Sequence, residues 1–361
     1  MEYIALDVHK KYTWARVENA KGDRLAEMRL AHIHGTVNKF ISRWTTGSPV
    51  AVETVGNWYW VVDEIEAGGG KPQLVNARLT KLMMGSVNKS DKLDAKGMNR
   101  LQRTGTLPTV WIPSSSVRDA RELPRTRMVL SRQRTQLKNR VHATLGKYGY
   151  GVEGASDAFG KKGRKIVEEL LLKLPPHTGQ ALRLILDELD HVTDNLKEIE
   201  GQMIGVFSPC PQAQWLKTLP GVGDILAVVI WTEIGTIERF GRAEQLASYC
   251  GLVARENSSG GKIRFGAVRR DVNVYLKWAF VEAANSSVLN AERCDYRHIS
   301  RLYQRIKARR GHGKAKVAVA RHLAEASFWM LKIRKESLIG NRCRPRNAKR
   351  ARLMGPSRPA F

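Results

Sequence analysis

Short apolar runs alternate with polar segments over the first third of the chain. The period of the pattern predicts strands over residues 3–7, 12–17, 24–29, 49–53 and 73–75, and helices over 37–44, 57–66 and 77–84. A further helix is expected to begin after Ser90, a candidate N-cap. A three-stranded meander that leads into alternating strands and helices is typical of a mixed sheet of the ribonuclease H type. We therefore expect an α/β domain over residues 1–112, with the first strand at the centre of its sheet.

After a break at residues 113–116 the pattern becomes helical. Residues 117–147 form one expected helix, and a second carries an apolar seam that steps by three and four residues: Leu182, Ile185, Leu189, Val192, Leu196, Ile199 and Met203. This seam predicts a coiled coil, whose partner is either the 117–147 helix of the same chain or a second protomer. Residues 113–208 are expected to be a basic helical, coiled-coil region.

Helical signals continue to residue 340. In the expected helix over 317–332, the apolar positions Leu323, Phe328, Trp329 and Leu331 are predicted to face a core. Residues 341–361 contain many arginines and three prolines, which predicts a disordered basic tail that adds affinity for phosphate. We expect a mainly helical domain over 209–340 and a tail over 341–361.

The charge of the chain narrows the class of partner. Lys and Arg number 61 against 34 acids, which gives a formal charge of +27 and favours polyanions, with nucleic acid first. Five bases of the first long helices are candidates for phosphate contact, although a charge run can equally be a solvated face: Arg118, Arg121, Arg125, Arg132 and Lys138. No apolar segment is long enough for a membrane span, and no signal-peptide pattern is present, so a cytoplasmic location without membrane contact is expected. The four scattered cysteines are expected to be reduced.

Four acids stand at the ends of expected elements. Asp7 and Glu53 end two predicted strands, while Asp91 and Asp94 share one face of a helix start. Any one such acid can be an ordinary solvated turn residue. Together they would repel one another unless a cation neutralised them, and Mg²⁺ prefers oxygen ligands. Because paired Mg²⁺ ions serve phosphoryl transfer, the set predicts a metal-dependent nuclease site.

Two glycine-containing segments lie in the C-terminal domain. Leu219-Pro-Gly-Val-Gly223 is similar to a helix-hairpin-helix turn, in which Gly221 and Gly223 would offer backbone N–H groups to a DNA phosphate, or else it is a structural turn. Residues 249–266 form a polar loop with two serines, Ser258 and Ser259, and three bases, Arg255, Lys262 and Arg264. A serine beside bases can attack a phosphodiester, but on the residues alone an ordinary flexible loop is the favoured interpretation.

In their order these motifs resemble the RuvC-like DEDD insertion-sequence transposases of the IS one-ten family. The resemblance rests on Ala5-Leu-Asp-Val-His-Lys10, Val52-Glu53 with Gly56 and Trp58, Val75-Asn76, Lys89-Ser-Asp-Lys-Leu-Asp-Ala95, Leu219-Pro-Gly-Val-Gly223, Cys250-Gly-Leu-Val, Ser259-Gly260 and Gly313-Lys-Ala-Lys-Val-Ala-Val-Ala-Arg321. The chain has Ser90 where the family usually has Thr, and Ala77 where it often has Pro. Neither difference touches a carboxylate.

The resemblance implies a chemistry for these residues. Asp7, Glu53, Asp91 and Asp94 would hold Mg²⁺, as two ions that Mn²⁺ can replace, and Ser259 would attack the DNA, with Ser258 as the fallback. The protein would excise and insert an insertion sequence through a covalent phosphoserine. Because the serine is far from the acids in sequence, one site can combine the acids of one protomer with the serine of another.

The resemblance also implies partners. These are donor and target DNA, a structured non-coding bridge RNA encoded by the element, and further copies of the chain, as a dimer assembling to a tetramer in a prokaryotic cytosol. Two alternatives remain open. One is a RuvC-like junction nuclease that hydrolyses DNA with metal alone. The other is a non-catalytic nucleic-acid scaffold.

Overall fold

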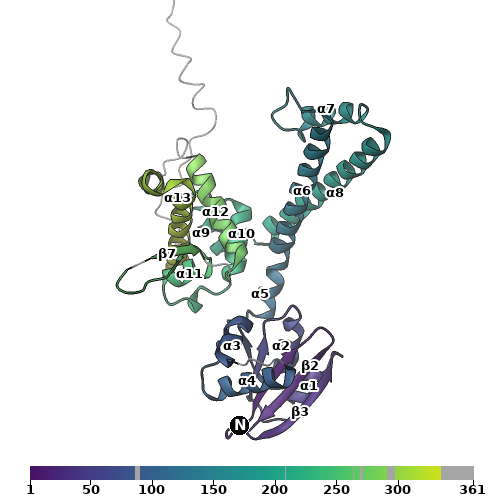
Figure 1. Cartoon of the computed structure of the whole chain (residues 1–361). Helices are drawn as coiled ribbons and strands as arrows, with labels where there is room; N and C mark the ends of the chain where they lie inside the picture. The colour runs from purple at the N-terminus through teal and green to yellow at the C-terminus, as the bar shows by residue number, and fades with distance from the viewer. Residues whose placement is uncertain (86–89, 208, 263, 269–270, 291–296, 335–361) are drawn as a thin grey trace, which may run out of the picture. The chain divides into compact units, whose positions relative to one another are not determined.

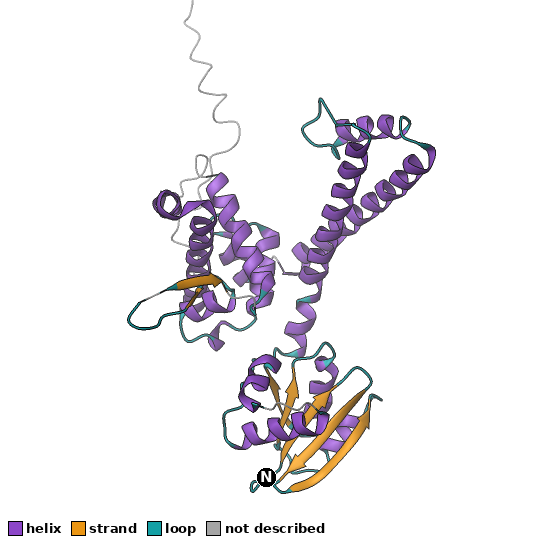
Figure 2. Cartoon of the chain, viewed as in Figure 1, coloured by secondary structure: helices purple, strands orange, loops and turns teal. Residues whose placement is uncertain are grey.

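The computed structural model of the chain describes residues 1–85, 90–207, 209–262, 264–268, 271–290 and 297–334. Contacts divide the chain into two compact units, Met1–Ser114 and Ser115–Phe361. Figure 2 shows that strands dominate the centre of the first unit and helices the second. The expected tail at 341–361 lies outside the described residues, as do Cys294 and Cys343.

The first unit is built on a five-stranded sheet (Figure 1). Its strands are β1 (Tyr3–Val8), β2 (Tyr12–Glu18), β3 (Arg24–Ala31), β4 (Pro49–Glu53) and β5 (Lys71–Val75). The order across the sheet is β3-β2-β1-β4-β5, with β2 antiparallel to both neighbours and with β1, β4 and β5 parallel. The predicted mixed sheet is confirmed, and β1 is its central strand.

Helices cover both faces of this sheet. They are α1 (Thr36–Ile41), α2 (Trp58–Ala67), α3 (Ala77–Met84) and α4 (Asp91–Arg103). On one face, Leu6 and Val52 join a core with residues of α1 and α2. On the other, Ala5 and Ala51 pack against Met98 of α4. Since successive side chains of a strand point to opposite faces, this alternation decides which face carries the acids.

A pair of long helices begins the second unit. Its elements are α5 (Ser115–Ala120), α6 (Glu122–Lys147), α7 (Lys161–Leu171) and α8 (Pro176–Phe207), and α8 runs alongside α6 of the same chain (Figure 1). The buried row of α8 consists of Leu182, Leu186, Leu189, Val192, Leu196, Ile199 and Met203. Leu186 therefore replaces the predicted Ile185, which is only partly buried. A straight helix drifts from a strict heptad by about 20° per repeat, which rotates a neighbouring position into the contact.

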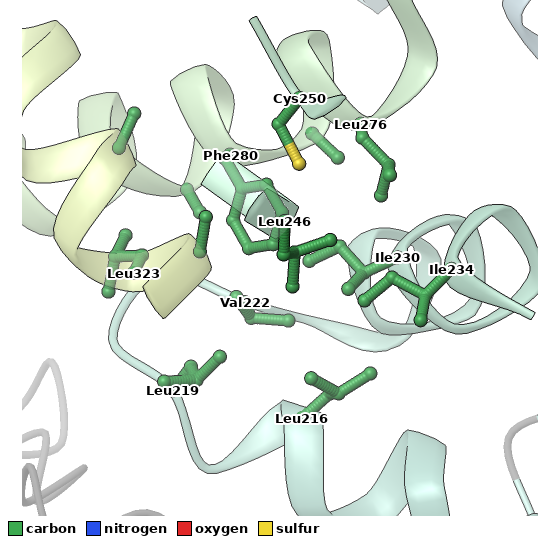
Figure 3. Packing of buried hydrophobic residues seen from close by; sticks show 14 of the residues in the cluster. Leu216, Leu219, Val222, Ile230, Ile234, Leu246, Cys250, Leu276, Phe280 and Leu323 are labelled. Carbon is green, nitrogen blue, oxygen red and sulfur yellow. The ribbon is translucent and has the colours of Figure 1, made fainter. Parts of the chain in front are cut away.

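The C-terminal helices enclose the largest hydrophobic cluster among the described residues. They are α9 (Pro211–Lys217), α10 (Asp224–Ile234), the short 3₁₀ helix η1 (Ile237–Arg239), α11 (Ala243–Tyr249), α12 (Val274–Leu289) and α13 (Arg297–Ile333). Figure 3 shows side chains of this cluster meeting, with Phe280 of α12 among them. None of the helices in the described ranges is both long enough and apolar enough to cross a bilayer.

The last helix corrects one prediction. Leu323, Phe328 and Leu331 are buried as expected, whereas the side chain of Trp329 is 57% exposed. Adjacent residues of a helix point about 100° apart, so Phe328 and Trp329 cannot both face the same core. The helical path of α13 is also interrupted at Gly311, whose φ of 80° breaks the repeat.

Candidate active site

Asp7 and Glu53 lie next to each other at the carboxyl ends of two parallel strands. Leu6 of β1 is in register with Val52 of β4, and each acid is the next residue along its strand. Asp7 shares its face with Ala5, and Glu53 shares its face with Ala51, because side chains alternate along a strand. Both acids therefore occupy the face of the sheet that α4 covers.

The first turn of α4 brings the other two acids to this face. Ser90 is the N-cap, and its hydroxyl accepts a hydrogen bond of 3.3 Å from the backbone N–H of Leu93. Asp91 and Asp94 follow in that first turn. Negative charge is stabilising at a helix N-terminus, where unpaired N–H groups and the helix dipole point. The local sequence thus fixes both the start of the helix and the place of its acids.

His9 completes a cluster with two of the acids. One ligand atom each of Asp7, His9 and Asp91 lies within 4.8 Å of the others. The Nε2 atom of His9 is 3.2 Å from Oδ2 of Asp7 and 3.2 Å from Oδ2 of Asp91. This nitrogen is buried, and its geometry gives no hydrogen bond to either oxygen. The hydroxyl of Tyr12 donates a 2.9 Å hydrogen bond to the same oxygen of Asp91.

The donor set fits a divalent cation. Two carboxylates and an imidazole nitrogen converge, and that nitrogen is a buried polar atom without a hydrogen bond. Carboxylate oxygens suit Mg²⁺ and Mn²⁺, and Mn²⁺ also accepts imidazole nitrogen. Asp7, Asp91 and His9 are thus the residues that could hold such an ion, with Glu53 on the neighbouring strand and Asp94 one turn along α4.

The electrostatics of Asp7 show why a cation would be stabilising there. Burial raises the pKa of Asp7, because the charged carboxylate loses its hydration. His9 opposes this rise, whereas the charges of Asp91 and Asp94 add to it. The pKa of Tyr12 is also raised, first of all because its hydroxyl donates to Asp91. Excess negative charge around Asp7 is therefore only partly balanced by the protein.

Not all four predicted acids enter the tight cluster. Within the described residues, the group of ligand atoms that meet within 4.8 Å contains Asp7 and Asp91 but neither Glu53 nor Asp94. Asp94 still raises the pKa of Asp7 through its charge, and Glu53 makes an interaction of its own. The arrangement is a core of two acids and a histidine with two further acids beside it.

Ser259 lies in the second unit, at the tip of a two-stranded hairpin. Its strands are β6 (Ala254–Glu256) and β7 (Phe265–Val268). At the tip the N–H of Lys262 donates to the carbonyl of Ser259 at 3.1 Å. Gly260 and Gly261 both have positive φ, at 56° and 72°, as a two-residue hairpin turn requires. The predicted loop is thus the connection of a short hairpin, and Ser259 is exposed at its tip.

The two serines differ in their surroundings. The hydroxyl of Ser258 donates a 2.6 Å hydrogen bond to Glu256, whereas the hydroxyl of Ser259 has no partner among the described residues. Lys262 and Arg264 are exposed on the same hairpin. Arg255 is 3.7 Å from Asp271. Of the two candidates, Ser259 is the one whose hydroxyl is available.

Most of the basic residues predicted to contact DNA, near the start of the long helices, have partners inside the protein. Arg121 is buried and donates to the backbone carbonyls of Thr232 and Glu233, at 3.0 and 2.8 Å. Arg125 forms a paired contact of 2.7 and 3.1 Å with the buried carboxylate of Glu233. Arg118 is buried as well. The contacts of Arg121 and Arg125 join the start of α6 to α10, and a phosphate role of these three arginines would need another arrangement of their side chains.

The other two predicted bases face outward to different degrees. Arg132 is exposed, and one of its guanidinium nitrogens lies 3.5 Å from the sulfur of Met128. The ammonium of Lys138 lies 4.7 Å from the centre of the Phe159 ring. Arg132 is accordingly the member of the set best placed to meet a phosphate.

The glycine turn between α9 and α10 is packed on one side and open on the other. A Cβ on Gly221 would lie 2.1 Å from the carbonyl oxygen of Ala283 in α12, and Gly221 has a φ of 75°. Leu219 and Val222 are buried in the core of Figure 3. A Cβ on Gly223 would meet no atom within 4 Å. Close packing requires Gly221, so a structural role accounts for that glycine; its phosphate-binding role stays a prediction.

Two features of the site were missed by the sequence interpretation, and both have signals in the sequence. His9 stands two residues after Asp7, which places both side chains on one face of β1 or its extension. The Gly260-Gly261 pair between two short segments is a hairpin signal. The exposed strands beside it lack alternating apolar residues, which hid the hairpin.

Comparisons with known families cover most of the chain. A family model of the DEDD IS110 type, described as a transposase, matches residues 4–149. A second, described as the transposase IS116/IS110/IS902 family, matches residues 213–304. The first includes all four predicted acids, and the second includes Ser259. The two matches occur in the order that the sequence motifs predicted.

Individual relatives agree with these families. The chain is 26% identical over 271 residues to the transposase for insertion sequence element IS1111A of Coxiella burnetii, covering 75% of this chain and 74% of the relative. It is 27% identical to a probable family 20 transposase of Pseudomonas aeruginosa, covering 78% and 83%. It is 24% identical to the transposase for insertion sequence element IS1328 of Yersinia enterocolitica, covering 78% and 82%. Together with the two family matches, these relatives show that the chain belongs to the IS110 family of DEDD transposases.

Proposed function

We propose that this transposase moves its element by strand exchange through a covalent phosphoserine formed on Ser259. The observation that carries the proposal is the convergence of Asp7, His9 and Asp91 within 4.8 Å. The exposed hydroxyl of Ser259 beside Lys262 and Arg264 supports it. In this assignment the first unit is a RuvC-like domain of the ribonuclease H type. Its four acids, Asp7, Glu53, Asp91 and Asp94, would hold two Mg²⁺ ions.

The reaction has two balanced steps. In the first, the Ser259 Oγ forms a bond to the scissile phosphorus as its hydroxyl proton passes to a base, and the bond from phosphorus to the 3′ oxygen breaks and that oxygen takes up a proton. In the second, the 3′-hydroxyl of the partner strand attacks the same phosphorus and releases Ser259. Bound Mg²⁺ would polarise the phosphate and stabilise charge on the leaving oxygen. Lys262 and Arg264 would bind the flanking phosphates.

Several copies of the chain take part in the proposed reaction. Strand exchange needs a serine at each of several DNA strands, which a dimer that assembles to a tetramer would supply. One site then combines the acids of one protomer with the serine of another. A mixture of Ser259→Ala chains with Asp7→Asn chains tests this point, with wild type as the reference. If the mixture of these two inactive variants forms the adduct, sites are shared between protomers. If it forms none, the shared site is contradicted.

A structured RNA encoded by the element is proposed as the guide. The charge of +27 supports a polyanionic partner in addition to DNA, and base pairing by such an RNA would supply the sequence specificity. The test is to purify the protein from a host that carries the complete element and to sequence the nucleic acid that remains bound. A discrete RNA from the element is the expected result, and its absence contradicts the guided mechanism.

A matched pair of variants tests the serine. Wild-type protein incubated with end-labelled element DNA and Mg²⁺ should give a protein–DNA adduct that survives denaturation. Ser259→Ala should abolish the adduct, whereas Ser258→Ala should keep it, because the Ser258 hydroxyl is already engaged with Glu256. An adduct from Ser259→Ala contradicts the assignment.

The alternative is a junction nuclease that hydrolyses DNA with metal-bound water. The observation in its favour is that the cluster of Asp7, His9 and Asp91 is complete within the first unit. It predicts nicked products, no adduct and an unchanged rate for Ser259→Ala. Strand-transfer products joined to a partner DNA separate the two functions.

A further inference from the structure

A cavity in the first unit opens at the turn between β1 and β2, on the side of the sheet that α2 covers, and has no role in the proposed chemistry. Its volume is about 260 Å³, and its walls are Lys10, His32, His34, Asn57 and Trp60. The lining combines a cation, two imidazoles, an amide and an indole. This composition differs from the carboxylate-rich neighbourhood of Asp7.

One tight turn connects the cavity with the acids. The N–H of His9 donates to the carbonyl of Tyr12 at 2.9 Å, which closes the turn between β1 and β2. The imidazole of His9 lies 3.2 Å from Asp7 and Asp91, while the next residue, Lys10, lines the cavity. The side-chain amide of Asn57 donates to the carbonyl of His9 at 3.1 Å. The same turn therefore contributes to the acid cluster and to the cavity wall.

The aromatic side of the cavity is held in place by internal contacts. The ring of His32 packs edge-on against Trp60, with 4.9 Å between the ring centres. One nitrogen of His32 lies 2.9 Å from the hydroxyl of Thr13 and the other 3.3 Å from the carbonyl of Lys10. His34 packs on the same indole at 5.9 Å, and its side chain is 92% exposed. His32 thus fixes the indole, whereas His34 stands at the open rim.

We infer that this cavity binds one unpaired nucleotide of the DNA strand next to the scissile phosphate. The inference rests on the proposed function, in which the acids act on DNA. An indole and an imidazole offer stacking surfaces to a base of any sequence, and an ammonium offers a contact to phosphate. The base lies against Trp60 and the adjoining phosphate lies at Lys10. Lys10 follows His9 directly, so the cavity and the acid cluster lie on the two sides of one turn, and a strand that contacts both passes around that turn.

Binding of this nucleotide has a purpose in the reaction. The carboxylates repel a phosphodiester backbone unless cations are present, so a grip on a neighbouring nucleotide provides affinity that the acids do not. It also holds the scissile bond in a fixed position, which lowers the barrier to attack. Trp60 and Lys10 are positioning residues in this scheme, and they do not touch the reacting atoms.

Photochemical cross-linking of the full chain locates the nucleotide. Element-end DNA is prepared with 5-iododeoxyuridine at single positions around the scissile phosphate, bound to the Ser259→Ala protein and irradiated. The expected result is a cross-link to the peptide that contains Trp60, or to the one with His32 and His34, from a position directly beside the scissile phosphate only. The inference is overturned if DNA labelled at each of these positions cross-links only to other peptides. It is also overturned if the cavity peptides cross-link to RNA and not to DNA.

Binding measurements on matched variants give an independent readout. Trp60→Ala should weaken DNA binding by about 10-fold, and Trp60→Phe should retain most of the affinity, since it keeps a stacking ring. Lys10→Gln should lower the slope of log affinity against log salt by about one. Lys71→Gln is the control, because Lys71 is exposed at the start of β5, and it should leave the slope unchanged. Adduct formation at saturating DNA should fall less than affinity does.

The outcomes separate this inference from the proposed function. Cross-linking and DNA binding are measured without serine chemistry, so they report on the cavity even if wild type forms no adduct. If wild type forms the adduct while folded Trp60→Ala and Lys10→Gln bind DNA as wild type does, the cavity inference alone is overturned. If Trp60→Ala does not fold, Lys10→Gln and the cross-link map decide.

Discussion

Nε2 of His9 lies 3.2 Å from Oδ2 of Asp91, so the turn after β1 meets the first turn of α4 at this contact. The same nitrogen is equally close to Asp7. His9 therefore stands between an acid of the central strand and an acid of the covering helix. The site depends on three chain segments that approach one another at this nitrogen.

The first prediction concerns metal affinity. His9→Ala should weaken Mn²⁺ binding by about 10-fold, because the site loses either a ligand or the group that orients two carboxylates. Electron paramagnetic resonance of free Mn²⁺ measures the change on the full chain. His191→Ala is the control, since His191 is an exposed residue of α8 and should leave the affinity unchanged. Equal affinity of His9→Ala and wild type would remove His9 from the site.

The second prediction concerns the pH dependence of stability. The pKa of Asp7 is raised in the folded protein, chiefly by burial, so the folded state holds this proton more tightly than the unfolded state. The contribution of Asp7 to the free energy of unfolding of the metal-free protein should accordingly fall as pH rises from the ordinary pKa of Asp to the raised pKa.

Asp7→Asn tests this dependence, because it keeps the shape and removes the charge. In EDTA at neutral pH its melting temperature should be a few degrees above that of wild type, and the difference should shrink at low pH. Added Mn²⁺ should stabilise wild type more than the variant. A variant less stable than wild type in EDTA at neutral pH would mean that the carboxylate of Asp7 makes a favourable contact.

The third prediction distinguishes structural from DNA-binding arginines. Glu233→Ala should destabilise the second unit by about 3–5 kcal/mol, because it leaves the guanidinium of Arg125 and the buried edge of Arg121 without their carboxylate. Chemical denaturation measures this loss. Arg125→Gln should also destabilise the fold, while its salt dependence of DNA binding stays near that of wild type.

Arg132→Gln is the matched comparison on the same helix. Its side chain is exposed, so the substitution should leave stability within about 0.5 kcal/mol and lower the slope of log affinity against log salt by about one. If Arg125→Gln instead lowers the slope while stability is unchanged, Arg125 contacts phosphate and the internal pair is secondary.

The fourth prediction uses two glycines of one turn. Gly221→Ala should destabilise the second unit by well over about 1 kcal/mol, since the new Cβ would collide with the carbonyl of Ala283 and the positive φ is unfavourable for alanine. Gly223→Ala should fold normally, because its Cβ meets open space. Thermal unfolding of both variants checks the difference. Similar melting temperatures would contradict the close approach of this turn to α12.

The sequence predicted the first unit well because its signals are local. Short apolar runs lead to Asp7 and Glu53 near the ends of two strands, and the N-cap Ser90 marks the start of α4. Once two strands are parallel neighbours, their terminal acids are brought together without any further information. The seam of α8 was also visible, although its rotation by one position at Leu186 depends on the shape of α6.

The remaining features depend on contacts between distant segments. Glu233 is the partner of Arg125, and nothing near either residue indicates that the two meet. A run of bases consequently looks like a DNA-binding face when part of it is an internal link. The cavity at Trp60 likewise combines the β1–β2 turn, the end of β3 and α2, three segments that only the folded sheet places together.

The capped start of α4 affects which of the acids would be lost by mutation in copies of this gene that are no longer selected for transposition. Asp91 lies where the helix dipole favours a negative charge, so its loss weakens the fold, whereas Asp7 is buried among like charges and its replacement by a neutral residue relieves strain in the folded protein. Both changes abolish the proposed chemistry. An inactive copy that must still fold therefore tolerates the loss of Asp7 more readily than the loss of Asp91, and a retained Asp91 is no sign of a functioning element.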